Sequence, residues 1–402
     1  MGLTSGSLIG LLFFVTAALI AGTVWIWPQR YGSVLRTAAT RAGLLLSSHL
    51  ALALAVLVAL NAHFLFFSSW DELIGTGGGA GLESGAQPLK PASKERPGGK
   101  ERPGTSVPLA NDGSVTSSGL SSSGPAMAAM VTGRKVSTRH PEITGDIEHV
   151  MVRGAISGIK AEAYVMLPAQ YFQKQYAKHR FPTVIMLTGY PGNPRALIRL
   201  LHFPSIVQKS EQAGQAQPMI YVLMRPTVAP PRDTECTDIP GGPQVETFFG
   251  TDLPRAISAA FHTNPGRGGW AIMGDSTGGY CAAKIAMKHS DRFSTAVSLS
   301  GYFHALKDIT TGDLYGGSQA IRNDNDLLWR AQHLPPPPIN ILVTSCKVGE
   351  RTYPQAQAFL TLARAPMRAD SLILDSGGHN YQTFARMLPG ALQWLSSHLV
   401  GA

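Results

Sequence analysis

Residues 274–278, Gly-Asp-Ser-Thr-Gly, combine a nucleophile with the small neighbours that a sharp turn needs. An apolar run, 270–273, precedes them and a helix-like segment, 280–288, follows them. A serine between a buried strand and a helix sits on a strained turn, which lifts its hydroxyl off the sheet. The next amide, that of Thr277, then points to where an oxyanion would develop. This pattern predicts that Ser276 is a nucleophile in acyl transfer, the alternative being a solvated serine on a Gly-rich turn.

A serine nucleophile needs a base that takes its proton. The last strand-like stretch, 371–374, leads into a Gly-Gly pair and then His379. A histidine on a glycine loop after the last strand is where this base is expected, so we predict that His379 is the general base. Four other histidines follow the Ser276 turn: His289, His304, His333 and His398.

The base in turn needs a carboxylate that orients it. In this order of elements the acid follows the strand before the last one, here 339–343. The loop after it, 344–350, offers Glu350 as its only carboxylate. We therefore predict Glu350 as the acid, with Asp308 or Asp313 as the alternatives.

A second oxyanion donor is expected from the loop 188–193, Thr-Gly-Tyr-Pro-Gly-Asn, after the strand-like stretch 183–187. Because Pro191 has no N–H group, the amide of Tyr190 is the natural donor. A simple Pro-Gly turn is the other interpretation.

Strand-like and helix-like stretches alternate through the last 260 residues or so. An opening hairpin is expected at 147–152 and 161–167. Further strands are expected at 183–187, 219–224, 270–273, 296–299, 339–343 and 371–374, and helices at 196–210, 251–262, 280–288, 353–364 and 381–399. Val-, Ile- and Leu-rich strands between helices predict a mostly parallel sheet covered on both faces, in the order of an α/β-hydrolase. Residues 302–338 form an insertion that resembles a cap over the site.

Two apolar segments near the N-terminus, 7–27 and 43–67, are long enough to cross a bilayer. Arg30, Arg36 and Arg41 lie between them, which predicts a cytoplasmic loop and an extracytoplasmic C-terminal domain. A signal peptide is the competing interpretation of the first segment. We expect a two-span anchor at 1–70, a flexible Gly/Ser/Pro-rich linker at 71–140 and a catalytic domain at 141–402.

The net charge of +9 comes from scattered basic residues that do not alternate with aromatic ones, so nucleic acid is not an expected partner. Three cysteines without a C-x-x-C pair predict neither a zinc site nor a dense disulfide scaffold. Outside the cell two of them are expected to pair, with Cys236 as one partner and either Cys281 or Cys346 as the other. The carboxylates Asp233, Glu235 and Asp238 are expected to cap turns and pair with neighbouring arginines, or else to bind a cation or a sugar hydroxyl.

Residues 145–400 resemble the esterase D and antigen 85 mycolyltransferase group of actinobacterial serine acyl-hydrolases and acyltransferases. The resemblance rests on the opening hairpin, the Leu-Thr-Gly-Tyr-Pro-Gly loop at 187–192, the Gly-Asp-Ser-Thr-Gly-Gly turn at 274–279, the late Glu350 and the Gly-His-Asn end at 378–380. Membrane-tethered members have similar N-terminal spans. The resemblance implies a triad of Ser276, Glu350 and His379 and an oxyanion hole formed by Tyr190 and Thr277. At 188–191 this chain has Thr-Gly-Tyr-Pro where secreted mycolyltransferases have Asp-Gly-Leu-Arg, so mycolyl specificity is not implied.

These observations predict a membrane-anchored, extracytoplasmic serine esterase or acyltransferase. Its substrate is expected to be an acyl-ester lipid or a small ester, and water or an alcohol such as a glycan completes the reaction. Membrane lipid is an expected neighbour, and neither a metal nor an organic cofactor is required. The alternative is a catalytically silent envelope-binding or assembly protein on the same fold.

Overall fold

The computed structural model describes residues 2–3, 5–29, 32–64, 67, 70–74, 90–91 and 130–402. Most of the predicted linker, 75–89 and 92–129, therefore lies outside the described residues, and so does Arg30.

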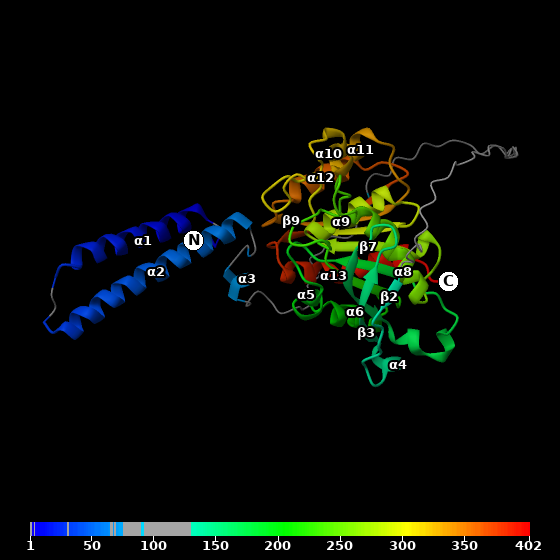
Figure 1. Cartoon of the computed structure of the whole chain (residues 1–402), viewed down its shortest axis with the longest axis horizontal. Helices are drawn as coiled ribbons and strands as arrows, with labels where there is room; N and C mark the ends of the chain where they lie inside the picture. The colour runs from blue at the N-terminus through cyan, green and yellow to red at the C-terminus, as the bar shows by residue number, and fades with distance from the viewer. Residues whose placement is uncertain are drawn as a thin grey trace, which may run out of the picture.

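Short runs rich in Val, Ile, Leu and Met form the strands of one twisted sheet (Figure 1). In the described residues the sheet has ten strands: β1 (Lys90–Pro91), β2 (Met130–Thr132), β3 (Asp146–Arg153), β4 (Lys160–Leu167), β5 (Thr183–Leu187), β6 (Ile220–Met224), β7 (Trp270–Asp275), β8 (Thr295–Leu299), β9 (Asn340–Val348) and β10 (Arg368–Ser376). Their order is β1-β10-β9-β8-β7-β5-β6-β4-β3-β2. Six neighbouring strands, β10, β9, β8, β7, β5 and β6, are parallel to one another. Strands β4, β3 and β2 continue the sheet beyond β6 as an antiparallel edge. The carboxyl ends of the parallel strands consequently share one edge of the sheet.

Helices cover both faces of this sheet, as the buried, continuously apolar strands require. The described helices are α1 (Gly6–Ile26), α2 (Val34–Phe64), α3 (Trp70–Ile74), α4 (Pro141–Thr144), α5 (Pro194–Arg199), α6 (Phe203–Gln212), α7 (Val245–Thr247), α8 (Leu253–Ala260), α9 (Thr277–Lys288), α10 (Gln319–Asn325), α11 (Leu327–His333), α12 (Tyr353–Leu362) and α13 (Tyr381–His398). Short 3₁₀ turns η1 (Ala169–Phe172), η2 (Lys174–Tyr176) and η4 (Arg267–Gly269) and a π turn η3 (Phe248–Asp252) complete the chain.

Alternate residues of each central strand divide between two hydrophobic cores. Ile185 and Ile272 face the core that contains α8, α9 and α12, whereas Val184 and Met273 face the core that contains α6 and α13. Figure 1 shows α9 and α12 on one side of the sheet and α6 and α13 on the other. The elbow strand β7 lies in the middle of the sheet and is buried on both faces, so Ser276 is held by a rigid part of the fold.

The structure differs from the predicted elements in three places. The helix expected at 196–210 is two helices, because His202 takes a left-handed conformation (φ 53°) between them. Strand β9 continues to Val348, since its polar residues 344–346 are buried in the sheet rather than exposed in a loop. The sheet also begins before residue 141: β2 pairs with β3, and β1 within the predicted linker pairs with β10.

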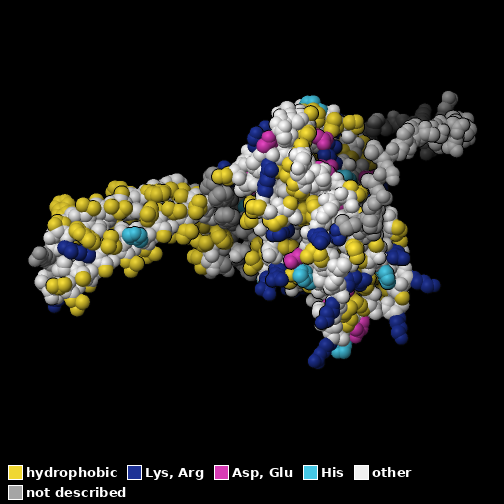
Figure 2. Space-filling view, in the orientation of Figure 1, with side chains coloured by type: hydrophobic (Ala, Val, Ile, Leu, Met, Phe, Trp, Pro, Cys, Tyr) yellow, Lys and Arg dark blue, Asp and Glu magenta, His cyan; other side chains and the backbone are white. Residues whose placement is uncertain are grey.

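Helices α1 and α2 are each long and apolar enough to cross a membrane, by length and composition. They lie side by side in Figure 1, and Figure 2 shows hydrophobic side chains covering their surface. Helix α2 starts nine residues before the predicted span 43–67 and has 31 residues, about 46 Å at 1.5 Å per residue. This length exceeds the thickness of a hydrocarbon core, which is about 30 Å. Arg41 lies in α2 before the predicted span, and its Nη2 donates to the carbonyl of Trp27 at 2.6 Å.

The packing of α13 on the sheet gives a test of this architecture. Leu388 is fully buried in the core between α13 and the sheet, whereas Gln382 on the same helix is exposed. We expect Leu388→Ala to lower the free energy of unfolding by about 2–5 kcal/mol, because it removes buried methyl groups and leaves a cavity. Gln382→Ala is the matched control and should change it by less than about 0.5 kcal/mol. Urea denaturation of the detergent-solubilised chain measures both, and equal effects would contradict the assigned packing.

Candidate active site

Ser276 occupies the turn between β7 and α9 in a conformation that L-residues rarely adopt (φ 54°, ψ −121°). The two glycines of the turn allow this. A Cβ atom at Gly274 would lie 2.5 Å from the backbone of Gly278, and one at Gly278 would lie 2.4 Å from the carbonyl oxygen of Leu187. Backbone from β5, β7 and α9 thus meets with no room for side chains, and this contact fixes the position of Ser276.

His379 lies on the loop between β10 and α13, and its ring bridges the other two predicted residues. Its Nε2 is 2.8 Å from Ser276 Oγ, and its Nδ1 is 3.0 Å from Glu350 Oε2 and 3.2 Å from Oε1. Glu350 follows β9 by two residues, and its side chain is only 1% exposed. The structure therefore brings together three side chains that are separated by up to 103 residues along the chain.

The loop that carries His379 is fixed on both sides. The next residue, Asn380, caps α13 by accepting a hydrogen bond from the Thr383 amide at 3.0 Å. The ring of Phe384, one turn into α13, packs edge-on against the imidazole with 5.3 Å between ring centroids. Sequence analysis did not identify Phe384, although the Asn-x-x-Thr cap at 380–383 predicts where α13 begins and hence which residues face His379.

The electrostatic environment favours a protonated His379. Burial lowers the pKa of this histidine, but the hydrogen bond and the charge of Glu350, together with the charge of Asp275, outweigh it, so the pKa lies above its usual value of 6.5. A raised pKa makes the imidazole a stronger base towards the serine hydroxyl. The ring also donates from Nδ1 to Glu350, which leaves Nε2 free to accept the serine proton.

Asp275 links the elbow to the loop 188–193. Its Oδ2 accepts a hydrogen bond from the Gly189 amide at 2.9 Å, and burial raises the pKa of this carboxyl to about 6. A Cβ atom at Gly189 would lie only 2.9 Å from Ser276 Cβ, so only glycine allows the loop to approach the serine this closely. Asp275 therefore holds the loop against the elbow and does not contact His379 through a hydrogen bond.

The two amides predicted to bind an oxyanion are both available. Thr277 is the first residue of α9, where an N–H group has no helical acceptor. In the described part of the chain no acceptor is found for the Tyr190 amide either, and the Tyr190 hydroxyl donates to the carbonyl of Pro231 at 3.1 Å. Tyr190 immediately follows Gly189, the residue packed against Ser276. Both amides thus belong to backbone that adjoins the serine.

The alternative acids and bases have other partners. His304 Nδ1 is 2.9 Å from Asp326, and Asp308 Oδ1 accepts from the Thr310 amide at 2.8 Å. Asp313 accepts from the amide of Tyr315 in its own loop. None of these contacts reaches Ser276.

Cys236 and Cys281 form a disulfide, and Cys346 is buried and lies outside this bond. Cys281 lies on α9 one turn after Thr277, so the bond ties the loop after β6 to the elbow helix. The expectation that Cys236 is one partner is confirmed. The choice between Cys281 and Cys346 depends on whether the loop after β6 lies beside α9 or beside β9, which spacing alone does not determine.

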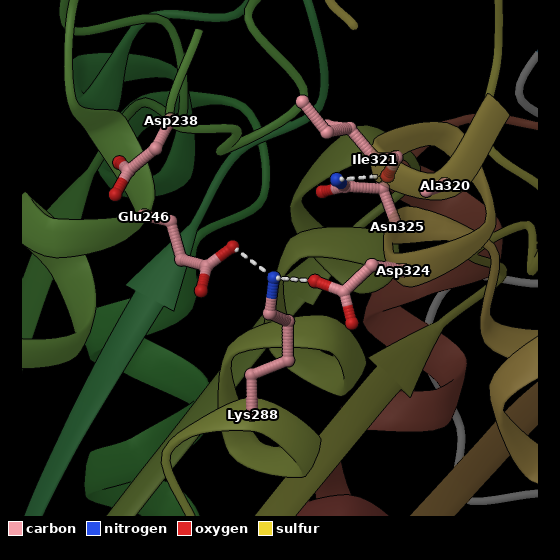
Figure 3. Close-up of a pocket in the computed structure, with 7 residues that line it drawn as sticks. All are labelled: Asp238, Glu246, Lys288, Ala320, Ile321, Asp324 and Asn325. Carbon is pink, nitrogen blue, oxygen red and sulfur yellow. Dashed lines mark hydrogen bonds and ion pairs between the residues drawn. The ribbon is translucent and has the colours of Figure 1, made fainter. Parts of the chain in front are cut away.

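A hollow of about 420 Å³ lies at the other end of α9 from Ser276 (Figure 3). Lys288 points into it between two carboxylates, with Nζ 2.7 Å from Glu246 and 2.6 Å from Asp324. In the described segments no group of three or more His, Cys, Asp or Glu residues is arranged to hold a metal ion. The hollow is separate from the residues around Ser276.

Residues 155–395 match a protein-family model described as "Putative esterase". Over 95 residues the chain is 35% identical to the MPT51/MPB51 antigen of Mycobacterium tuberculosis. This match covers 23% of the chain and 31% of that protein, so the chain spans about a third of the length of this curated relative.

Two solved structures have the same fold. A ferulic acid esterase superposes with a TM-score of 0.54 at 18% identity, over 63% of this chain and 98% of that one. The S-formylglutathione hydrolase of Agrobacterium tumefaciens superposes with a TM-score of 0.54 at 14% identity, over 68% of this chain and all of that one. At these identities the likeness concerns the fold, and it confirms the predicted α/β-hydrolase architecture.

The contact between Glu350 and His379 gives a prediction about pH. A base must be neutral to accept the serine proton, so reactivity is lost as the pH falls through the pKa of His379. Because this pKa is raised, the rate at which a fluorophosphonate labels Ser276 should rise with pH through a midpoint above 6.5. In Glu350→Gln the charge is lost and burial dominates, so the midpoint should move down and the plateau rate should fall by about a thousandfold.

The matched control is Asp375→Asn, which removes an exposed carboxylate that pairs with Lys347 at 2.7 Å on the same edge of the sheet. It should leave both the midpoint and the plateau unchanged. An upward shift of the midpoint in Glu350→Gln would contradict the assigned role of Glu350.

Proposed function

This chain belongs to the esterase family, and from that premise we propose that it is a serine esterase or acyltransferase with Ser276, His379 and Glu350 as its catalytic triad. The observation that carries the proposal is one continuous set of contacts: Ser276 Oγ to His379 Nε2 at 2.8 Å, and His379 Nδ1 to Glu350 Oε2 at 3.0 Å. A hydroxyl, an imidazole and a buried carboxylate in this order are what activation of a serine requires.

In the first half of the reaction Ser276 Oγ attacks the carbonyl carbon of the ester and His379 Nε2 takes the hydroxyl proton. The carbonyl oxygen becomes an oxyanion, which the amides of Tyr190 and Thr277 stabilise. As the C–O bond to the alcohol breaks, the imidazolium gives its proton to the departing oxygen. Glu350 stays ionised and stabilises the imidazolium while it exists.

In the second half of the reaction a new hydroxyl group resolves the acyl-enzyme. His379 takes a proton from this hydroxyl, its oxygen attacks the acyl carbon, and the proton returns to Ser276 as the serine ester bond breaks. Water as the acceptor gives hydrolysis, and an alcohol such as a glycan gives acyl transfer. Family membership supports the hydrolytic reaction, and acyl transfer is the finer part of the proposal.

The substrate that we propose is a small ester or an acyl-ester lipid. The insertion 302–338 supports selection among esters, because its first part packs against the loop after β6, which contacts Thr277, and shares a small hydrophobic cluster with that loop. This cluster contains Ile239, Ala305, Leu314 and Tyr315.

We propose that residues 1–70 anchor the protein in a membrane, that 71–140 link the anchor to the catalytic domain, and that this domain lies outside the cytoplasm. The length and apolar surface of α1 and α2 support an anchor, and a signal sequence is the alternative for the first segment. The Cys236–Cys281 disulfide supports the extracytoplasmic side, since disulfides persist in oxidising compartments.

Ser276→Ala tests the nucleophile. The variant should hydrolyse p-nitrophenyl butyrate at least about a thousandfold more slowly than the wild-type chain and should not be labelled by a fluorophosphonate, because no hydroxyl remains to form the acyl-enzyme. Adding glycerol or trehalose to the wild-type reaction distinguishes hydrolysis from transfer by the appearance of an acylated product. Ser205→Ala, at an exposed position on α6, is the control. Wild-type activity in Ser276→Ala would contradict the proposal.

The orientation is tested with two introduced cysteines and a maleimide that does not cross membranes. Gln382 lies on the exposed surface of α13, and Ser33 lies in the turn before α2. In intact cells the Gln382→Cys variant should be labelled and the Ser33→Cys variant should be protected, whereas both should be labelled after lysis. The opposite pattern would place the catalytic domain in the cytoplasm.

A further inference from the structure

A buried polar cluster lies directly behind Thr277, the first residue of α9. The Thr277 hydroxyl donates to Asp233 Oδ2 at 3.4 Å, and the Tyr302 hydroxyl lies 3.3 Å from Thr277 Oγ1. Tyr302 also hydrogen-bonds Glu235 Oε1. All four side chains are at most 8% exposed. They come from the loop after β6, the start of α9 and the segment after β8, so three separate segments of the chain converge on one threonine.

The protonation states of Glu235 and Asp233 allow each hydroxyl in this cluster to accept one hydrogen bond and donate the next. Burial, and then the neighbouring charge of Asp233, raise the pKa of Glu235 to about 8. Burial raises the pKa of Asp233 to about 6, so at neutral pH Glu235 is protonated and Asp233 is ionised. A protonated Glu235 donates to Tyr302, which frees the Tyr302 hydrogen for Thr277, whose own hydrogen points to the Asp233 carboxylate. Hydrogen bonds aligned in this way strengthen one another.

The loop that carries these two acids is attached to α9 at three successive levels. Thr277 binds it through Asp233, Cys281 binds it through the disulfide to Cys236, and Lys284 Nζ donates to the carbonyl of Glu235. Thr277, Cys281 and Lys284 are spaced i, i+4 and i+7, so they form one stripe on the helix. The loop and the elbow helix therefore behave as one unit, and the contact at Thr277 is its end nearest Ser276.

We propose that Tyr302, Glu235 and Asp233 are positioning residues, which hold Thr277 so that its backbone amide points at the oxyanion. The proposal rests on the proposed function of Ser276 as a nucleophile. An oxyanion hole acts because its donors are already oriented before the reaction begins. Thr277 follows a strained residue and its amide has no helical acceptor, so its orientation depends on what holds its side chain.

Tyr280 provides a matched control for the loss of one buried hydroxyl. Its ring stacks on that of Tyr302 with 4.9 Å between centroids, and both side chains are buried. The Tyr280 hydroxyl, however, donates to the carbonyl of Asn325 at 2.6 Å, and not to Thr277, Asp233 or Glu235. Tyr280→Phe therefore removes a comparable hydrogen bond from the same helix without altering the contacts of Thr277.

The test measures hydrolysis of p-nitrophenyl butyrate by the full chain in detergent, together with inhibition by a trifluoromethyl ketone and by the corresponding methyl ketone. The trifluoromethyl ketone forms a tetrahedral adduct with an oxyanion, and the methyl ketone reports on binding alone. We expect Tyr302→Phe to lower kcat/KM and to weaken the trifluoromethyl ketone by about tenfold, with the methyl ketone unchanged within about twofold. Tyr280→Phe should change none of the three by more than about twofold.

Two further variants keep the test decisive if Tyr302→Phe fails to fold. Thr277→Val keeps the amide and removes the hydroxyl, so it should reproduce the loss, and adding Tyr302→Phe to it should cost no more than about a further twofold. Glu235→Gln resembles the protonated acid and should retain activity, whereas Glu235→Leu should lose about tenfold. Thermal unfolding of each variant separates these losses from a loss of stability.

The outcomes separate this inference from the proposed function. If the wild-type chain is neither labelled at Ser276 nor active on the ester, the proposed function fails. If it is labelled and active but Tyr302→Phe and Glu235→Leu match Tyr280→Phe, the positioning inference alone is overturned. Equal weakening of both ketones would also overturn it, because that result would show lost binding rather than lost oxyanion stabilisation.

Discussion

The site depends on a backbone contact that excludes side chains. At Gly189, Gly274 and Gly278 an added Cβ atom would lie between 2.4 and 2.9 Å from a neighbouring atom, so the ends of β5 and β7 and the first turn of α9 touch directly. This contact gives Ser276 its left-handed conformation and brings the loop of Tyr190 beside it. Because β7 lies at the centre of a sheet that is buried on both faces, the strain at Ser276 is supported by the two hydrophobic cores.

Buried ionisable groups surround this glycine contact, although burying a charged group costs free energy. Asp275 and Glu350 are buried near Ser276. Asp275 accepts a hydrogen bond from the Gly189 amide, and Glu350 accepts one from His379. Asp233 and Glu235 are buried in the cluster around Thr277, at the start of α9. In the central strands β5, β6, β7 and β8 the only acidic or basic residue is Asp275, at the carboxyl end of β7. The middles of these strands therefore pack the two cores, and the polar residues of the site lie at their carboxyl ends.

Much of this arrangement could be predicted from the sequence because its signals are local. The Gly-x-Ser-x-Gly turn, the Val- and Ile-rich strands and the Gly-Gly-His segment each occupy a few consecutive residues, and the order of elements then places Ser276, Glu350 and His379 on one edge. The position of the break at His202 and the extension of β9 to Val348 depend on tertiary packing, which overrides local propensity. The cluster around Thr277 was missed because its hydrogen bonds join residues that are 25 to 67 positions apart. Asp233 does cap a turn as expected, since it accepts from the Glu235 amide at 3.1 Å, but the expected pairing with neighbouring arginines did not predict the buried hydrogen bonds. Arg232 instead donates to the carbonyls of Thr311 and Asp313.

The bond between Cys236 and Cys281 also bears on how the protein matures. Both cysteines are reduced when the chain leaves the ribosome, and their sulfurs meet only once the loop after β6 has reached the elbow helix. If the domain is exported, oxidation of the two thiols follows translocation, so the bond between this loop and α9 forms outside the cytoplasm. Protein recovered from a reducing cytosol would lack the bond between this loop and α9. Preparing the oxidised protein calls for a secretory host or an oxidative refolding step.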